Sequence, residues 1–143
     1  MKYIFTLLLF SLSACASYSP SINDAPDGKT VVYNISIEQA KRIVSTTMSS
    51  HFAGREVLPL ELPAIGFTTY TRMLADTWST TVTIIPVLAK SGQTEVTALK
   101  IDLRGTGTSF FTGRIHYENF KDRLSQELAN TGKLVTADSY LIN

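Results

Sequence analysis

The chain has 143 residues, of which 44% are hydrophobic, with 13 basic and 12 acidic residues and a formal net charge of +1. A nearly neutral chain lacks the basic footprint on which nucleic-acid binding depends. One cysteine and two histidines exclude an internal disulfide framework and a zinc site of the usual Cys/His spacing. The length and composition are typical of one globular domain.

The N-terminus has the layout of a secretory signal. Lys2 gives a positive start, a mostly apolar run of ten residues follows, and small residues surround Cys15. The run is too short to cross a bilayer, which takes about 20 residues. We therefore expect residues 1–14 to be removed as a signal peptide, with cleavage after Ala14. An ordinary secreted protein cut near Ala14 or Ala16, in which Cys15 has no role, is the alternative.

The stretch Leu12-Ser13-Ala14-Cys15 resembles the lipobox of bacterial lipoproteins, in which an aliphatic residue and two small residues precede a cysteine. The resemblance implies that Cys15 is diacylated on its sulfur and, after cleavage, acylated on its new amino group. Several acyl chains, at about 0.8 kcal/mol per buried CH₂, hold a protein on a membrane without a spanning helix. Because Ala16 rather than aspartate follows the cysteine, the resemblance further implies an outer-membrane location. We expect the domain to face the periplasm, but the sequence does not distinguish this orientation from one that faces the outside.

Cleavage would leave 129 residues, with 12 basic and 12 acidic side chains. The first part of this mature chain, residues 15–29, is polar and contains two prolines, a glycine and two aspartates. Such a composition is typical of a flexible tether. We therefore expect residues 15–29 to be a lipidated tether and residues 30–143 to be a single domain.

The first elements of this domain are a strand and a helix. Residues 30–35 are rich in β-branched and aromatic side chains, which predicts a strand. Ser36 and Gln39 have the spacing of a capping box, so a helix is expected to begin there. Apolar residues recur every three or four positions as far as Met48, and Gly54 is a suitable C-terminal stop.

Three strands are expected in the middle of the chain, over residues 67–74, 78–90 and 94–104. The glycine within the segment 91–93 indicates a hairpin turn between the last two. Pro86 cannot donate to a ladder and therefore indicates an edge or a bulge. In the third strand apolar and charged residues alternate, which predicts one buried and one wet face.

The C-terminal part is expected to form a helix over residues 115–131, ended by Gly132, and a short strand near Leu134 and Val135. The predicted order is strand-helix-strand-strand-strand-helix. It indicates an α+β domain with an antiparallel sheet of about four strands and two helices on one face. At the level of topology this resembles small domains of bacterial envelope lipoproteins, including those of outer-membrane assembly machinery.

Residues with catalytic potential are few and scattered. His51 is expected at the end of the first helix and His116 at the start of the second, near Glu118. Neither histidine has neighbours in sequence that complete a catalytic or metal site, so both are interpreted as surface or helix-end residues. Asp76, Asp102 and Glu118 would form a carboxylate pair only if the fold brought two of them together.

The segment 105–113 is glycine-rich and is expected to be a loop. It lacks the Gly-Lys-Ser/Thr ending of a phosphate-binding loop, and no G-x-S-x-G nucleophile elbow occurs in the chain. Phe110 and Phe111 are interpreted as anchors that hold this loop against the core.

An apolar segment between Gly54 and Gly66 is the first candidate partner surface, because exposed apolar patches often mark interaction sites. Alternatively, the segment covers one end of the core. The exposed face of the sheet is the second candidate. The candidate partner residues are Val57, Leu58, Leu60, Leu62, Tyr70 and Arg72.

The sequence thus favours a lipid-anchored, non-catalytic binding or structural module that docks on an envelope protein complex, with no cofactor and no metal. One alternative is a small-ligand-binding lipoprotein, with a cavity behind Trp78 or Phe120. The other is a small envelope hydrolase, in which His116, Glu118 or Asp102 would share a pocket with another titratable side chain.

Overall fold

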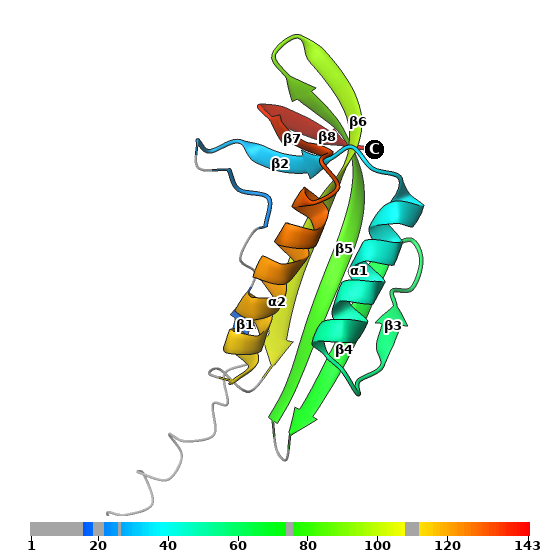
Figure 1. Cartoon of the computed structure of the whole chain (residues 1–143), viewed down its shortest axis with the longest axis vertical. Helices are drawn as coiled ribbons and strands as arrows, with labels where there is room; N and C mark the ends of the chain where they lie inside the picture. Colours follow the sequence, from blue (N-terminus) through cyan, green and yellow to red (C-terminus); the bar gives the residue numbers. More distant parts are fainter. Residues whose placement is uncertain (1–15, 19–21, 26, 74–75, 108–111) are drawn as a thin grey trace, which may run out of the picture.

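The computed structural model describes residues 16–18, 22–25, 27–73, 76–107 and 112–143 (Figure 1). Over these ranges the fold is α+β, with two helices and one antiparallel sheet, as predicted. The sheet has eight strands in the described ranges, so the prediction of about four strands was wrong. The bounds are β1 Ala16–Tyr18, β2 Thr30–Tyr33, α1 Ile37–His51, β3 Val57–Pro59, β4 Gly66–Met73, β5 Asp76–Ser91, β6 Thr94–Gly107, α2 Thr112–Ala129, β7 Leu134–Ala137 and β8 Ser139–Ile142.

The centre of the sheet is the long hairpin of β5 and β6. Its ladder runs without interruption from the pair Trp78 and Gly107 to the pair Ser91 and Thr94, and Gly92 turns the chain with a φ of +59°. The position of Pro86 explains why a residue without a backbone N–H is tolerated in this ladder. The outer edge of β5 pairs with β4 up to Thr83 and with β8 from Val87, so Pro86 lies where neither neighbour needs its missing N–H.

Both helices pack on one face of this sheet (Figure 1). The helix start predicted at Ser36 is confirmed, because the Ser36 Oγ accepts a hydrogen bond from the Gln39 amide at 3.1 Å, which is one of the two bonds of the predicted capping box. The predicted apolar stripe of α2 is fully buried and packs against apolar side chains of β5 and β6. The stripe consists of Tyr117, Phe120, Leu124 and Leu128.

The sheet closes on itself at the end farther from β1. β7 pairs with the outer edge of β2, and the chain continues through Asp138 into β8, which pairs with the outer edge of β5. Since β2 also pairs with β6, the strands β5, β6, β2, β7 and β8 form a ring at this end. A second apolar cluster lies on the side of the sheet away from the helices, and its small side chains suit a tightly curved sheet. The buried members of this cluster are Val32, Val87, Ala89, Ala98 and Ala137.

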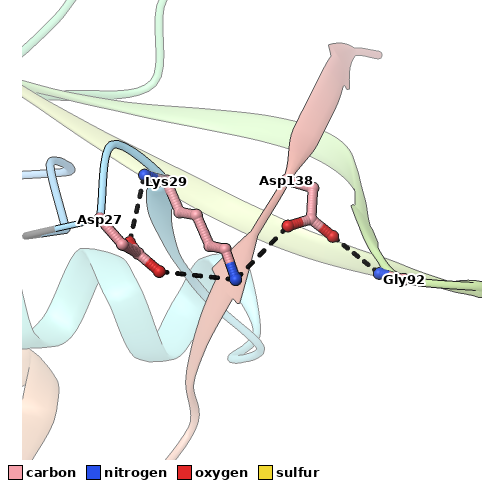
Figure 2. Close-up of polar contacts among 4 residues, drawn as sticks. All are labelled: Asp27, Lys29, Gly92 and Asp138. Atoms are coloured by element: carbon pink, nitrogen blue, oxygen red, sulfur yellow. Dashed lines mark hydrogen bonds and ion pairs between the residues drawn. The ribbon is translucent and has the colours of Figure 1, made fainter.

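Asp138 holds the closing segment in place (Figure 2). The Gly92 amide in the β5–β6 turn donates to the Asp138 Oδ2 at 2.8 Å, and the Lys29 Nζ lies 3.6 Å from the Asp138 Oδ1. These contacts lower the pKa of the Asp138 carboxyl, first through the Gly92 amide and then through the Lys29 charge. Lys29 also pairs with Asp27 at 3.5 Å, so the ion pairs and the Gly92 hydrogen bond together link three parts of the chain at this closed end.

Part of the predicted tether is packed against the domain. β1 pairs with the last three residues of β6, from Ala16 opposite Gly107 to Tyr18 opposite Gly105. Farther along, Asn23 is buried on the same edge of β6, where its Nδ2 donates to the Asp102 Oδ1 at 3.0 Å and its Oδ1 accepts from the Ile101 amide at 3.4 Å. This segment satisfies polar groups of β6 that β2 leaves unpaired, which is why it joins the sheet.

Short strands and the end of β6 account for the remaining differences from prediction. β1, β3 and β8 have three or four residues each, too few for an alternating pattern to be recognised. The predicted loop over 105–113 was wrong at both ends, because Gly105 and Gly107 belong to β6 and Gly113 belongs to α2. Phe110 and Phe111 lie outside the described residues.

Candidate functional site

The side of β4, β5 and β6 that faces away from the helices forms a polar surface, which we call the open face. The wet face predicted for β6 is confirmed, since Leu99, Ile101 and Leu103 are buried under the helices and the residues between them project to the other side. By the same alternation and the strand register, the open face comprises Thr68, Tyr70, Ser79, Thr81, Thr83, Asp102, Arg104 and Thr106.

Hydroxyl groups on the open face are paired across strands. The Thr68 and Thr81 hydroxyls lie 2.9 Å apart, and the Ser79 and Thr106 hydroxyls lie 2.7 Å apart. Their hydrogen-bonding capacity is thus partly used within the sheet. Tyr70, in register with Ser79, is 62% exposed and is the large aromatic side chain on this face. The open face therefore combines a hydroxyl-lined surface with one exposed aromatic ring, a residue type common at protein interfaces.

The predicted apolar partner segment is divided between core and surface. Val57, Leu58 and Leu60 are all half-buried, and Val57 packs against the main core. Leu62, in contrast, is 88% exposed. The segment therefore covers one end of the core and still presents an apolar side chain to solvent. Arg72 lies in β4, but its side chain is outside the described part of the structure.

Part of the outer edge of β4 is not paired with another strand among the described residues. β3 pairs only with Phe67, Thr68 and Thr69 of β4. Beyond that point, residues 70–73 continue β4 with no strand on their outer side in the described parts of the chain. An unpaired edge can accept a strand from a partner. This edge was not apparent from the sequence, because it depends on how far β3 extends along β4.

The two histidines meet at the ends of the helices. The His51 Nε2 lies 3.1 Å from the backbone oxygen of His116, so the ring donates through Nε2 and ties the end of α1 to the start of α2. The His51 ring is also 4.7 Å from the Phe52 ring and 5.5 Å from the Phe120 ring, centroid to centroid. Burial lowers the pKa of His51. The hydrogen bond to the His116 backbone oxygen opposes this shift, and the charges of Arg123 and His116 lower the pKa further. This geometry is that of a structural contact between helices.

This lowered pKa predicts how stability depends on pH. The unfolded chain takes up a proton at His51 near pH 6.5, before the folded protein does, so stability is complete above that pH and falls below it. We expect the unfolding midpoint to decrease when the pH is lowered from about 7.5 to about 5.5, and to decrease less in His51→Gln. The variant keeps a donor for the His116 oxygen, and His116 is common to both proteins. Equal pH dependence of the two proteins would contradict this assignment.

The candidate carboxylates are placed on opposite sides of the sheet. Asp102 lies on the open face, where its Oδ1 is 2.6 Å from the Lys100 Nζ. Glu118 is on α2, and its Oε2 is 2.9 Å from the Lys121 Nζ. The fold therefore does not combine these two carboxylates in one site. The side chain of Asp76 is outside the described set.

The space behind Trp78 is occupied by the protein itself. Gly105, Gly107 and Gly113 approach this ring so closely that a Cβ at any of the three would lie within 2.7 Å of it. The described residues instead form an open groove of about 320 Å³ between the helices. The groove is lined by Arg42, Ile43, Thr46, Thr47, Ser50, Arg123 and Glu127. This groove is one place at which to test the ligand-binding alternative, and it differs from the place predicted.

Two further observations concern metal and membrane. In the ranges covered by the structure, no three His, Cys, Asp or Glu side chains are placed to hold a metal ion. Neither described helix is long and apolar enough to cross a bilayer. Comparison of the chain with protein-family models, with curated proteins and with solved structures finds no match.

Proposed function

We propose that this chain is a lipid-anchored protein of the bacterial cell envelope, held at the outer membrane by acyl chains on Cys15 and facing the periplasm. In this proposal the domain is a non-catalytic module that docks on an envelope protein complex. The observation that carries it is the lipobox-like stretch Leu12-Ser13-Ala14-Cys15 directly after an apolar run. Ala14 and Cys15 lie outside the described residues, so this support comes from the sequence.

The docking part of the proposal rests on the surface around β3 and β4. Tyr70 is exposed on the open face, and residues 70–73 offer an unpaired strand edge. Leu62 is exposed toward the other end of β4, in the segment between β3 and β4. A partner strand added at this edge would gain backbone hydrogen bonds and contact with the exposed side chains. Anchoring on a membrane raises the effective concentration of the domain near a membrane-associated partner.

The first test compares the wild type with Cys15→Ser by crosslinking in intact cells. A photoreactive residue is placed at Tyr70, and a matched one at Gln126 on the exposed side of α2. We expect a discrete partner to be captured at Tyr70 in the lipidated protein, little capture at Gln126, and loss of the Tyr70 product in Cys15→Ser. The reason is that the unanchored domain is no longer concentrated at the membrane.

Full function of a soluble Cys15→Ser protein would contradict the anchoring part of the proposal. Capture at Gln126 but not at Tyr70 would place the partner on the helices instead. Absence of a partner in both forms would favour the small-ligand alternative, for which the groove containing Arg42 and Arg123 is the place to test.

A further inference from the structure

The position of β1 restricts where a lipid on Cys15 can lie. Ala16 is paired with Gly107 at the end of β6, and Cys15 is the residue before it. The described chain thus starts at this end of the sheet, at the residue that directly follows the proposed acylation site. In Figure 1 the same end carries the start of α2, the end of β4 and the start of β5. In the sequence, no spacer separates the proposed attachment point from the first residue that pairs with the sheet.

Several contacts connect β1 to the start of α2. Gly107 pairs with Ala16 on one side and with Trp78 on the other. The Trp78 ring in turn lies against Gly113, in the first turn of α2. The first exposed residues of α2 are thus held at the same end as β1. An acyl chain that enters a bilayer from Cys15 brings this whole end to the headgroup region.

The side chains at this end have the chemistry of a membrane interface. Arg114, Ile115 and His116 are exposed at the start of α2, and the Ile115 side chain is 62% exposed. On the open face, Tyr70 lies in the same cross-strand row as Ser17 of β1, and Arg104 lies in the next row. Arginine, tyrosine and an exposed aliphatic side chain are suited to the boundary between anionic headgroups and acyl chains.

Exposed apolar residues alone do not define the orientation, because the closed end of the sheet also exposes Leu141 and Ile142. The two ends are far apart. Leu141 pairs with Leu88, which lies ten residues along β5 from Trp78. At about 3.3 Å per residue this separation is about 33 Å. If the acyl chains enter the bilayer at the β1 end and β5 points away from it, the closed end lies outside the headgroup region.

We propose that the domain is held on the membrane in one orientation, with the start of α2 at the headgroup region, Ile115 at the boundary with the acyl chains, and the closed end of the sheet away from the bilayer. This inference rests on the proposed acylation of Cys15. It also places the unpaired edge of β4 close to the membrane surface, where a membrane-associated partner is accessible.

The test uses the full lipidated protein in liposomes that contain phosphatidylglycerol and a nitroxide-labelled lipid. An environment-sensitive fluorophore is attached to a single new cysteine in Ile115→Cys or in Leu141→Cys. Cys15 does not react, since its sulfur is already a thioether. We expect quenching by the nitroxide lipid at position 115 and about tenfold less at position 141, because short-range quenching does not extend over about 33 Å.

A matched variant separates the role of β1 from that of the lipid. A flexible spacer of about 15 Gly and Ser residues between Cys15 and Ala16 spans about 20 Å on average, so it leaves the anchor intact but frees the domain. We expect quenching at position 115 to fall strongly in this variant. Equally weak quenching at both positions without the spacer, or stronger quenching at position 141, overturns the orientation. A protein that does not bind liposomes at all overturns the proposed acylation instead.

Discussion

Replacement of Phe120 by alanine is expected to lower the free energy of unfolding by about 3–5 kcal/mol. Phe120 is fully buried on α2, and its ring lies 5.1 Å from the Phe52 ring just after α1 and 5.5 Å from the His51 ring, centroid to centroid. The alanine variant loses apolar burial and leaves a cavity between the helices and the sheet. Because small domains have a total stability of about 5–15 kcal/mol, this change removes a large part of it.

Denaturant titration of the purified protein, followed by circular dichroism and by the fluorescence of the single tryptophan, measures this loss. Ile115→Ala is the matched control, since it shortens an aliphatic side chain on the same helix that is 62% exposed. We expect the control to change stability by at most about 0.5 kcal/mol. A loss of similar size in both variants would show that the Phe120 site is not the centre of the helix packing.

Replacement of Gly113 by alanine is expected to destabilise the protein by about 1–3 kcal/mol, although alanine is the better helix former by about 0.8–1.0 kcal/mol. A Cβ at Gly113 would lie 2.5 Å from two atoms of the Trp78 ring. The ring is buried, and Gly105 and Gly107 already crowd it from β6, so it has little room to move. Steric overlap therefore outweighs the gain in helix propensity.

A double-mutant cycle with Trp78→Leu tests this cause. The Trp78 Nε1 has no hydrogen-bond partner among the described residues, so the leucine variant removes ring packing without breaking a bond seen there. In that background we expect Gly113→Ala to be neutral or stabilising. Gly132→Ala is a control that introduces backbone strain without steric overlap. Gly132 has a φ of +65°, and a Cβ added there would have no atom within 4 Å. If Gly113→Ala stabilises the wild type, the proposed crowding is absent.

The elements that depend on local patterns were predictable from the sequence. The Ser36 and Gln39 pair marks the start of α1, the spacing from Tyr117 to Leu128 marks the buried face of α2, and alternation marks the two sides of β6. Each of these signals lies within a few turns of helix or one strand, where periodicity reports burial directly. The lipobox-like stretch at Cys15 is local in the same sense, since the prediction of lipidation depends on four adjacent residues and the apolar run before them.

The candidate site depended on contacts that no local pattern encodes. β3 extends along only three residues of β4, and this short pairing determines which part of the β4 edge is open. Likewise, Leu62 is exposed while Val57 is packed against the core, although both belong to one apolar segment. The residues have similar hydrophobicity, so only their positions relative to the sheet distinguish a residue that packs against the core from an exposed one.

The sequence by itself determined two amphipathic helices, the central β5–β6 hairpin and an N-terminal motif that predicts lipidation of Cys15. Only the tertiary structure decided that β7 and β8 close the sheet at one end and that β1 pairs with β6 at the other. These pairings join residues about 90 positions apart in the case of Ala16 and Gly107. The sequence of a short strand contains too few residues to specify its partner. Where such a strand pairs is determined by the unpaired edges of the long β5–β6 hairpin.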